Sequence, residues 1–432
     1  MTFFSHEECT TYRVRINALI ALLKKSFPHK KGIVVLCADF EREREPFYQD
    51  SSFYYLTGLL EPSVVYVCTF DGEAVLYEPA YTIERSVWLP VTYNKHYLQE
   101  LNIASTKMLG EKVAGYSLDA FAQCSVYKNL IADLVMYSQS GYTIFTPLQE
   151  VSFPVYAIQE KLQRCEPSLK DSIVDCSYQI AQLRRKKEQR EIEYLYRAIE
   201  ITAIAQEAAA GVIKPGKRES DIQAAIDYIY TEAQATRAFA SVVGAGKNST
   251  VLHYVSNKDS LHKGEVVVVD IGASFNHYCG DITRTYPISG TFTDRQKEVY
   301  EIVLETQEYI AALARPGMWL NNKDHAEQSL NHLAKKYIAQ KGYGDYFPHG
   351  IGHFVGLDVH DVGDYNEPLA PGDVITIEPG IYIPEESLGI RIEDMYWIVK
   401  NEAVCLSEGI AKTVNDVEGI MKSFKEKSSI GE

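Results

Sequence analysis

The chain has 432 residues, a formal net charge of −15 and a sequence pI near 5.3. Its length exceeds one ordinary domain core and predicts two domains. The acidic balance argues against binding to nucleic acid or to an anionic membrane surface, which needs clustered lysine and arginine, and no apolar run approaches the roughly 20 residues of a membrane span.

The eight cysteines are scattered through the chain, with no CxxC pair and no dense framework of the kind found in small secreted domains. This usage predicts reduced thiols. The first residues, MTFFSHEECTTYRVRINAL, lack a basic segment followed by an apolar one, so a signal peptide is not expected. Together the two features predict a cytoplasmic location.

The first 174 residues alternate short β-rich runs with helical stretches. GIVVLCADF, VVYVCTF and EAVLYEP are of strand type, whereas RVRINALIALLKKSF has a helical pattern. The composition becomes polar and then strongly charged at about residues 166–190, and a long amphipathic helix follows. We therefore expect a mixed α/β domain over 1–174 and a second domain over 175–432.

Within the second domain the same order of elements occurs twice. A helix ends at a Pro-Gly pair at 215–216, and another helix ends at a Pro-Gly pair at 316–317. Each pair is followed by a further helical stretch and then by a β-rich run, GEVVVVDIGA or GDVITIEPGI. This pattern predicts a duplicated domain of helix-helix-strand halves related by a pseudo-twofold axis.

Both halves place acids and a histidine at matching positions. Each β-rich run has a carboxylate six residues after its first glycine, and a histidine stands 17 or 18 residues upstream, His253 or His360. Farther downstream comes a second acid, within GDITRT or RIED. The four acids are Asp270, Asp281, Glu378 and Glu393.

Acids are unusual in strands that are otherwise apolar. An ionised carboxylate there costs several kcal/mol unless it is paired or bound to a metal. The nearby strands offer one evident guanidinium each, Arg284 and Arg391, so pairing does not account for four acids. Unpaired carboxylates would repel one another and take up protons, and bound cations would relieve this. We therefore expect a metal centre.

The segment HGIGHFVGLDVHD, residues 349–361, contributes three histidines. The gap between His349 and His353 is that of a zinc-protease helix, but the accompanying glutamate is missing and two glycines disfavour a helix. The alternation of apolar residues predicts an extended strand. In a strand, His349 and His353 would lie about 13 Å apart, too far for both to bind one metal centre directly.

Five segments in this region resemble a known family. LHY, DIGASFNHYCGDITRT, HGIGHFVGLDVHDVG, ITIEPGIYI and GIRIED resemble, in order and spacing, the signatures of the pita-bread metallopeptidases, above all the Xaa-Pro aminopeptidases (aminopeptidase P) and prolidases. The likeness covers residues 177 to about 410. FYQDSSFYYLTGLLEP, residues 47–62, resembles part of the aminopeptidase P N-terminal domain. The implied α/β (α+β) fold has an N-terminal creatinase-like domain and a C-terminal pita-bread domain.

The resemblance also implies roles for individual residues. Two divalent ions, with Mn(II) the usual choice, would be held by Asp270, Asp281, His353, Glu378 and Glu393. Glu378 would also transfer a proton during catalysis. His253 and His360 would bind the substrate and stabilise its oxyanion, and Arg391 would support a ligand carboxylate. His349 would line the proline pocket or bond the backbone.

The implied activity is release of the first residue from peptides with proline at position two. The alternatives are a prolidase restricted to Xaa-Pro dipeptides, a methionine aminopeptidase, which lacks the N-terminal domain, and a binding protein without catalysis, although no ligand is missing here.

Trp88 lies near the place where tetrameric relatives reach a neighbouring subunit. We therefore expect a homo-oligomer, either a dimer or a tetramer.

Overall fold

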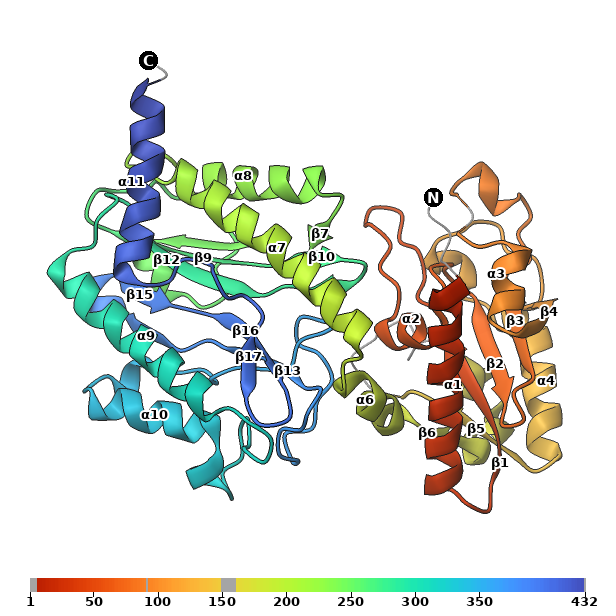
Figure 1. Cartoon of the computed structure of the whole chain (residues 1–432). Helices are drawn as coiled ribbons and strands as arrows, with labels where there is room; N and C mark the ends of the chain where they lie inside the picture. The colour runs from red at the N-terminus through yellow and green to blue at the C-terminus, as the bar shows by residue number, and fades with distance from the viewer. Residues whose placement is uncertain (1–5, 91, 149–160, 431–432) are drawn as a thin grey trace. The chain divides into compact units, whose positions relative to one another are not determined.

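The structure, a computed structural model, describes residues 6–90, 92–148 and 161–430. The chain forms two compact units, residues 1–184 and 185–432 (Figure 1). The division lies beyond residue 174, the boundary expected from composition, because the strand and helix around residues 173–184 belong to the first unit. Among the described residues, no helix is both long and apolar enough to cross a membrane.

The N-terminal unit is built on one mixed sheet. Its strand order is β4-β3-β2-β1-β5-β6, with antiparallel pairs β1–β2 and β2–β3 and parallel pairs β3–β4, β1–β5 and β5–β6. The central strand β1 is buried over six of its seven residues. The strands are β1 Lys31–Cys37, β2 Val65–Thr69, β3 Ala74–Glu78, β4 Ile103–Met108, β5 Tyr142–Thr146 and β6 Ile173–Asp175.

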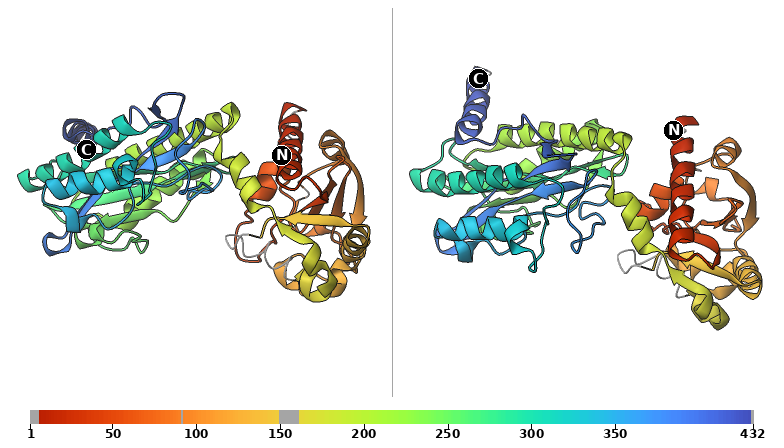
Figure 2. Two further views of the ribbon diagram at one scale, coloured as in Figure 1. Left: turned by 90° about the horizontal axis from the view of Figure 1, so that it is seen from below. Right: turned by 60° about the horizontal axis from the view of Figure 1, so that its bottom comes forward.

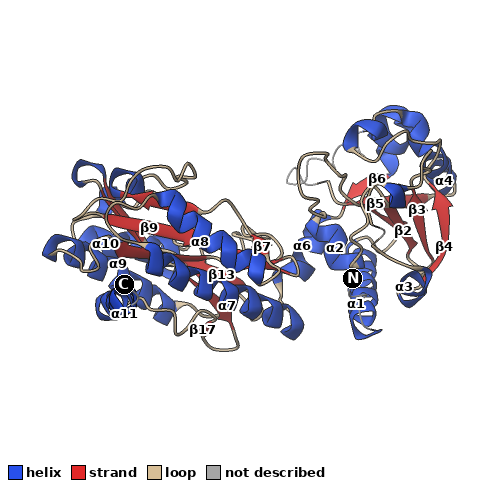
Figure 3. Cartoon of the chain, turned by 90° about the horizontal axis from the view of Figure 1, so that it is seen from above, coloured by secondary structure: helices blue, strands red, loops and turns tan. Residues whose placement is uncertain are grey.

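Helices flank this sheet, which confirms the predicted mixed α/β domain (Figure 3). They are α1 His6–Ser26, α2 Ser51–Thr57, α3 Lys95–Glu100, α4 Lys128–Gln139 and α6 Ser177–Arg185. Helix α2 has a defined start and stop. The Asp50 side chain accepts a hydrogen bond from the Phe53 amide, and Gly58, at φ 66°, ends the helix in the left-handed conformation.

The cysteines differ from expectation at one pair. Cys124 and Cys165 form a disulfide in the N-terminal unit, so the prediction that all thiols are reduced is wrong for these two. They are 41 positions apart in the sequence, and spacing alone does not reveal pairs that only the fold brings together. Cys37, Cys68, Cys176, Cys279 and Cys405 are free.

The C-terminal unit shows the expected repeat. Helices α7 and α8 precede one group of strands, and α9 and α10 precede another. The Pro-Gly pair after α7 and the one after α9 each place their glycine at positive φ, 87° at Gly216 and 90° at Gly317. Both turns thus use the conformation that glycine adopts most readily. The helices are α7 Gln189–Val212, α8 Glu219–Glu232, α9 Asp294–Leu313, α10 Leu330–Gln340 and α11 Val414–Ile430.

The strands of this unit lie against the helices (Figure 2). Helix α7 packs on β9, β10 and β12, and α9 packs on β13, β14 and β15. The sheets are ordered β12-β9-β8, β13-β16-β17 and β11-β10-β7, and β14 pairs with β15. The strands are β7 Thr236–Arg237, β8 Val242–Ala245, β9 Val266–Ile271, β10 Ala273–Phe275, β11 Tyr278–Cys279, β12 Ile282–Pro287, β13 Val374–Ile377, β14 Gly380–Ile383, β15 Leu388–Arg391, β16 Asp394–Ile398 and β17 Ala403–Cys405.

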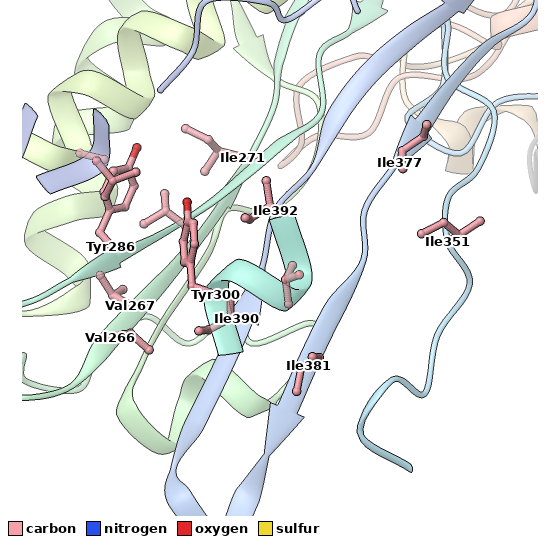
Figure 4. Close-up of a cluster of buried hydrophobic side chains, with 14 of the residues drawn as sticks. Val266, Val267, Ile271, Tyr286, Tyr300, Ile351, Ile377, Ile381, Ile390 and Ile392 are labelled. Carbon is pink, nitrogen blue, oxygen red and sulfur yellow. The ribbon is translucent and has the colours of Figure 1, made fainter. Parts of the chain in front are cut away.

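The two halves share one apolar core. Side chains of both repeats, among them Ile271 and Ile392, pack in the cluster drawn in Figure 4, together with Tyr286 and Tyr300. Valines fill the first strand of the repeat and isoleucines the second, as expected for strands buried between layers. The apolar contact fixes the two strand groups against each other, so the polar residues at their ends have set positions.

Candidate metal centre

Two aspartates come from paired strands of the first half. Asp270 is the fifth residue of β9, where it pairs with Thr283 of the antiparallel strand β12. Asp281 stands immediately before β12. The apolar face of β9 is buried in the core, and the strand pairing keeps the two aspartates at the same end of the sheet.

Two glutamates come from the corresponding strands of the second half. Glu378 directly follows β13 and Glu393 directly precedes β16, and these strands pair antiparallel with Ile377 opposite Asp394. The halves are joined here, because the Glu393 amide donates to the Thr283 carbonyl at 3.1 Å. Acids predicted from the repeat are therefore neighbours in space.

Three of the predicted ligands converge closely. Asp281, His353 and Glu393 each offer a ligand atom, and these atoms all lie within 4.8 Å of one another. His353 Nε2 is 3.4 Å from Asp281 Oδ2 and 3.5 Å from Glu378 Oε1. Asp270 lines the same cavity. All five predicted ligands thus surround one space.

The orientation of His353 suits a ligand. Its Nδ1 lies 3.1 Å from the Phe354 carbonyl, to which the N–H can donate, and this leaves Nε2 facing the acids. The backbone on either side is held by Thr376, whose amide donates to the His353 carbonyl at 2.9 Å. Gly352 is required here, since a Cβ would lie 2.0 Å from the Thr376 carbonyl oxygen.

The prediction of an extended strand over residues 349–361 is wrong. The segment forms bends, with one isolated bridge between Phe354 and Ile375. Hydrogen bonds link it to β13, but Gly352 and Gly356 allow close approaches that a regular strand does not make. As a result, His349 Nδ1 and His353 Nε2 both lie within 4 Å of Glu378.

The acids carry the electrostatic signature of unpaired groups. Burial raises the pKa of Asp281 and Glu393 well above the usual range, and the neighbouring carboxylates raise it further. Burial also raises the pKa of Glu378, against the lowering effect of His353 and Arg391. Bound cations would replace the protons that such a cluster otherwise takes up.

Among the residues that the structure describes, the guanidinium of Arg391 reaches the cluster, and it contacts Asp270. Arg391 donates to Asp270 Oδ2 at 2.7 Å, to the Tyr382 hydroxyl at 2.9 Å and to Thr283 Oγ1 at 3.2 Å. The other carboxylate oxygen of Asp270, Oδ1, is buried without a hydrogen-bond partner among the described residues. A buried anionic oxygen left in this way fits a cation ligand.

Arg284, the second guanidinium expected near the acids, points elsewhere. It donates to Asp394 Oδ1 at 2.7 Å and to the Glu393 carbonyl at 2.7 Å, and it is fully buried. It therefore holds the backbone of a ligand but neutralises none of the four acids. The cluster keeps its excess negative charge.

The other predicted site histidines, His253, His349 and His360, line the same cavity. His349 has both ring nitrogens in contact, Nδ1 with the Gly350 carbonyl and Nε2 with the Tyr382 hydroxyl, each at 2.8 Å. Burial, with a contribution from Arg391, lowers the pKa of His349 to about 4. His360 lies with its ring 4.2 Å from that of His353. Burial, His353 and His253 lower the pKa of His360, so it can donate as a neutral imidazole.

The cavity measures about 620 Å³, in the range of ligand pockets. It holds the acids and histidines described above. Its apolar lining is formed by Phe239, Ala240, Val242, Leu252, Val255, Val359 and Tyr365. A peptide end with apolar side chains fits such a space.

Sequence reasoning missed several residues of the site. Thr283 donates to Glu393 Oε2 at 2.7 Å and so orients a ligand. Its position two residues after Asp281 in a strand was the available signal, because such residues share a face. The apolar lining had no such signal, since Phe239 and Leu252 resemble ordinary core residues.

Comparisons with known proteins agree with this geometry. Residues 193–400 match the model of metallopeptidase family M24, and residues 12–111 match the aminopeptidase P N-terminal domain. The chain is 30% identical to the Xaa-Pro aminopeptidase of Escherichia coli over 93% of its length and 96% of the relative. It is 41% identical to the Xaa-Pro dipeptidase of Pyrococcus furiosus, but over only 53% of this chain and 65% of that protein.

A solved structure has a similar fold. Aminopeptidase P from E. coli with the inhibitor Pro-Leu matches with a TM-score of 0.80 and 25% identity, covering 98% of this chain and all of that one. The likeness extends through both units, which confirms the expected pair of domains. The protein is a metal-dependent peptidase that belongs to metallopeptidase family M24, with Xaa-Pro aminopeptidases as relatives along nearly its whole length.

Proposed function

We propose that the protein removes the first residue from peptides whose second residue is proline. The observation that carries this proposal is the cluster of unpaired buried acids around His353, in a chain that carries both domains of the Xaa-Pro aminopeptidases. The E. coli relative bears the name Xaa-Pro aminopeptidase, and its structure was solved with Pro-Leu.

The proposed cofactor is a pair of divalent ions, with Mn(II) favoured because four of the five ligands are carboxylates. Asp270, Asp281, His353, Glu378 and Glu393 would hold these ions. Bound there, the ions supply Lewis acidity and a water of lowered pKa.

The chain's own side chains complete the chemistry. Glu378 lies 3.5 Å from His353 and can accept a proton from the attacking water and deliver it to the leaving nitrogen. His360 and His253 line the cavity, where they can donate to the carbonyl oxygen and hold the substrate backbone. Arg391 fixes Asp270 through its 2.7 Å bond. His349 would lie at the edge of the proline pocket.

Proline sets the demand on the pocket. Its nitrogen carries no hydrogen once it is in a peptide bond, and its ring fixes φ, so recognition has to come from shape and apolar contact. The lining that includes Phe239, Leu252 and Val255 provides such a surface. The same chemistry would serve a dipeptidase, and the Pyrococcus relative is one by name.

Peptide length separates these activities. The full chain loaded with Mn(II) is incubated with Xaa-Pro, Xaa-Pro-Yaa and Met-Ala peptides of matched first residue, and the released amino acid is measured. We expect cleavage of the tripeptide. Cleavage confined to the dipeptide would identify a prolidase, cleavage of Met-Ala alone a methionine aminopeptidase, and no metal-dependent cleavage a binding protein.

We also propose a homo-oligomer, dimeric or tetrameric, in the cytoplasm. The exposed Trp88, whose ring lies 5.9 Å from that of Tyr116, offers an apolar contact for a second copy. The Cys124–Cys165 disulfide is unusual for a reducing compartment. Light scattering would give the subunit number, and thiol labelling of freshly lysed cells would show whether the pair is oxidised where the protein works.

A further inference from the structure

Two buried glutamines occupy matching positions in the repeat. Gln206 of α7 and Gln307 of α9 each stand nine residues before the proline of their Pro-Gly turn, in QEAAAGVIKPG and QEYIAALARPG. Both are almost fully buried, 1% and 0% exposed. A polar side chain at such a place is costly unless its hydrogen bonds are satisfied.

Gln206 bonds the backbone beside two predicted ligands. Its Nε2 donates to the Val269 carbonyl at 3.1 Å and to the Ile282 carbonyl at 2.9 Å. Val269 directly precedes Asp270, and Ile282 directly follows Asp281. One amide therefore ties β9 to β12 directly beside the two aspartates.

Gln307 makes the corresponding contact in the second half. Its Nε2 donates to the Ile377 carbonyl at 3.2 Å, and Ile377 directly precedes Glu378. Asp270 and Glu378 are the matched acids of the repeat, so the two glutamines hold equivalent carbonyls on opposite sides of the pseudo-twofold axis.

The orientation of each amide is fixed from its other side. The Tyr286 hydroxyl lies 3.1 Å from Gln206 Oε1, and Lys412 Nζ lies 3.1 Å from Gln307 Oε1. A carbonyl can only accept and an ammonium can only donate, so in each glutamine Nε2 must face the strand. Neither side chain touches the cavity, so neither is a catalytic residue.

We propose that Gln206 and Gln307 are positioning residues that set the spacing of the metal ligands across the two halves of the repeat. This inference rests on the proposed metal centre. Acids that repel one another need a support that does not depend on pairing between them, and the glutamines provide it through the backbone. Gln206 bonds the backbone beside two ligands, whereas Gln307 bonds it beside one. We therefore expect Gln206 to have the larger effect on metal binding.

Metal affinity tests this, with no need for substrate. The metal-free full chain and the variants Gln206→Met and Gln307→Met are titrated with Mn(II) by calorimetry, and their unfolding temperatures are measured without metal. Methionine keeps the volume and removes the hydrogen bonds. We expect Mn(II) binding to weaken roughly 10- to 100-fold, the usual effect of losing a group that supports a ligand, and more for Gln206→Met.

Gln296→Met is the matched control. Gln296 lies on α9, is 7% exposed, and its Nε2 donates to the Gly264 carbonyl at 2.8 Å, away from the acids. This variant should lose stability yet bind Mn(II) within about twofold of wild type. Glutamine variants that are folded and bind like this control would overturn the proposal.

Tyr286→Phe provides a milder variant if Gln206→Met does not fold. It removes the hydroxyl that orients Gln206 and should weaken Mn(II) binding roughly two- to tenfold, the effect of one hydrogen bond. Unchanged affinity in Tyr286→Phe together with Gln307→Met would reject the role. A wild-type chain that binds no Mn(II) would instead refute the metal centre itself, and this inference with it.

Discussion

Glu393 and Asp394 are adjacent buried carboxylates that differ in their partners and in the direction of their pKa shifts. Asp394 accepts from Arg284, Lys412 and Ser407. Burial alone would raise the pKa of Asp394, but Arg284 and Lys412 hold it below the usual range. Glu393 faces the other acids, and burial and Asp281 raise its pKa well above the usual range. Two residues adjacent in the sequence thus differ in kind: Asp394 is a structural charge with partners, whereas Glu393 faces other acids.

The comparison shows that burial by itself does not identify a functional acid. Asp394 has the partners that a buried charge needs, and breaking such a set is costly. Within the described part of the chain, the Glu393 carboxylate accepts a hydrogen bond from the Thr283 hydroxyl and from no cationic side chain, so its charge is left for a cation. The difference lies in the partners, and it can be tested at each residue separately.

The largest effect is expected from Glu393→Gln. The amide keeps the shape but removes one ligand charge, so turnover should fall roughly a thousandfold or more, as the metal's contribution of several kcal/mol is lost. The unfolding free energy of the metal-free chain should not fall, because repulsion among the acids is relieved. Peptidase assays and urea unfolding measure the two quantities, and a strongly destabilised variant would contradict the comparison.

Asp394→Asn should give the reverse result. Arg284 would be left buried with one charged partner fewer, which costs about 3–5 kcal/mol of unfolding free energy. The Mn(II) affinity of the folded fraction should stay close to wild type. Chemical denaturation checks the first expectation and calorimetry the second. Full stability in this variant would mean that the two acids are not different in kind.

His360→Asn tests whether a histidine of the cavity acts on the substrate and not on the metal. If His360 donates to the developing oxyanion, kcat should drop about 10²- to 10³-fold while metal content stays unchanged. Steady-state kinetics and elemental analysis of the same preparation separate the two effects. Parallel loss of metal would instead place His360 among the ligands.

The smallest effect concerns pH and His349. Its pKa is lowered to about 4 in the folded chain, below the ordinary value of about 6.5. The unfolded chain therefore binds the extra proton more readily, so stability falls as pH drops from about 6.5 towards 4, by no more than about 3 kcal/mol. Urea unfolding across this range should show a weaker dependence in His349→Gln. An identical dependence would exclude this assignment.

Much of the site could be predicted because the two halves of the C-terminal unit repeat the same spacing of acids and histidines. Asp270 and Glu378 stand at matching places in β-rich runs, and a charge in such a run is conspicuous. The strands that carry them are buried on both faces, so their positions follow from local pattern. The repeated helix-helix-strand order of the C-terminal unit was predictable from the same spacing.

The parts that could not be predicted depend on contacts between distant segments. Arg284 was expected beside the acids, but its strand face directs it to Asp394. The segment over 349–361 was expected to be a strand, but its glycines fit against Thr376 and Asp361. Cys124 and Cys165 come together only in the folded unit. None of these contacts leaves a periodic signal.

The most direct test of the proposed metal centre is a count of bound metal. Wild-type chain and Glu393→Gln are dialysed to equilibrium against Mn(II) and analysed for metal per chain. About two ions per chain are expected for wild type and clearly fewer for Glu393→Gln, with both chains folded. Equal metal content in the two proteins, or none in wild type, would contradict the claim that the unpaired acids form a metal centre.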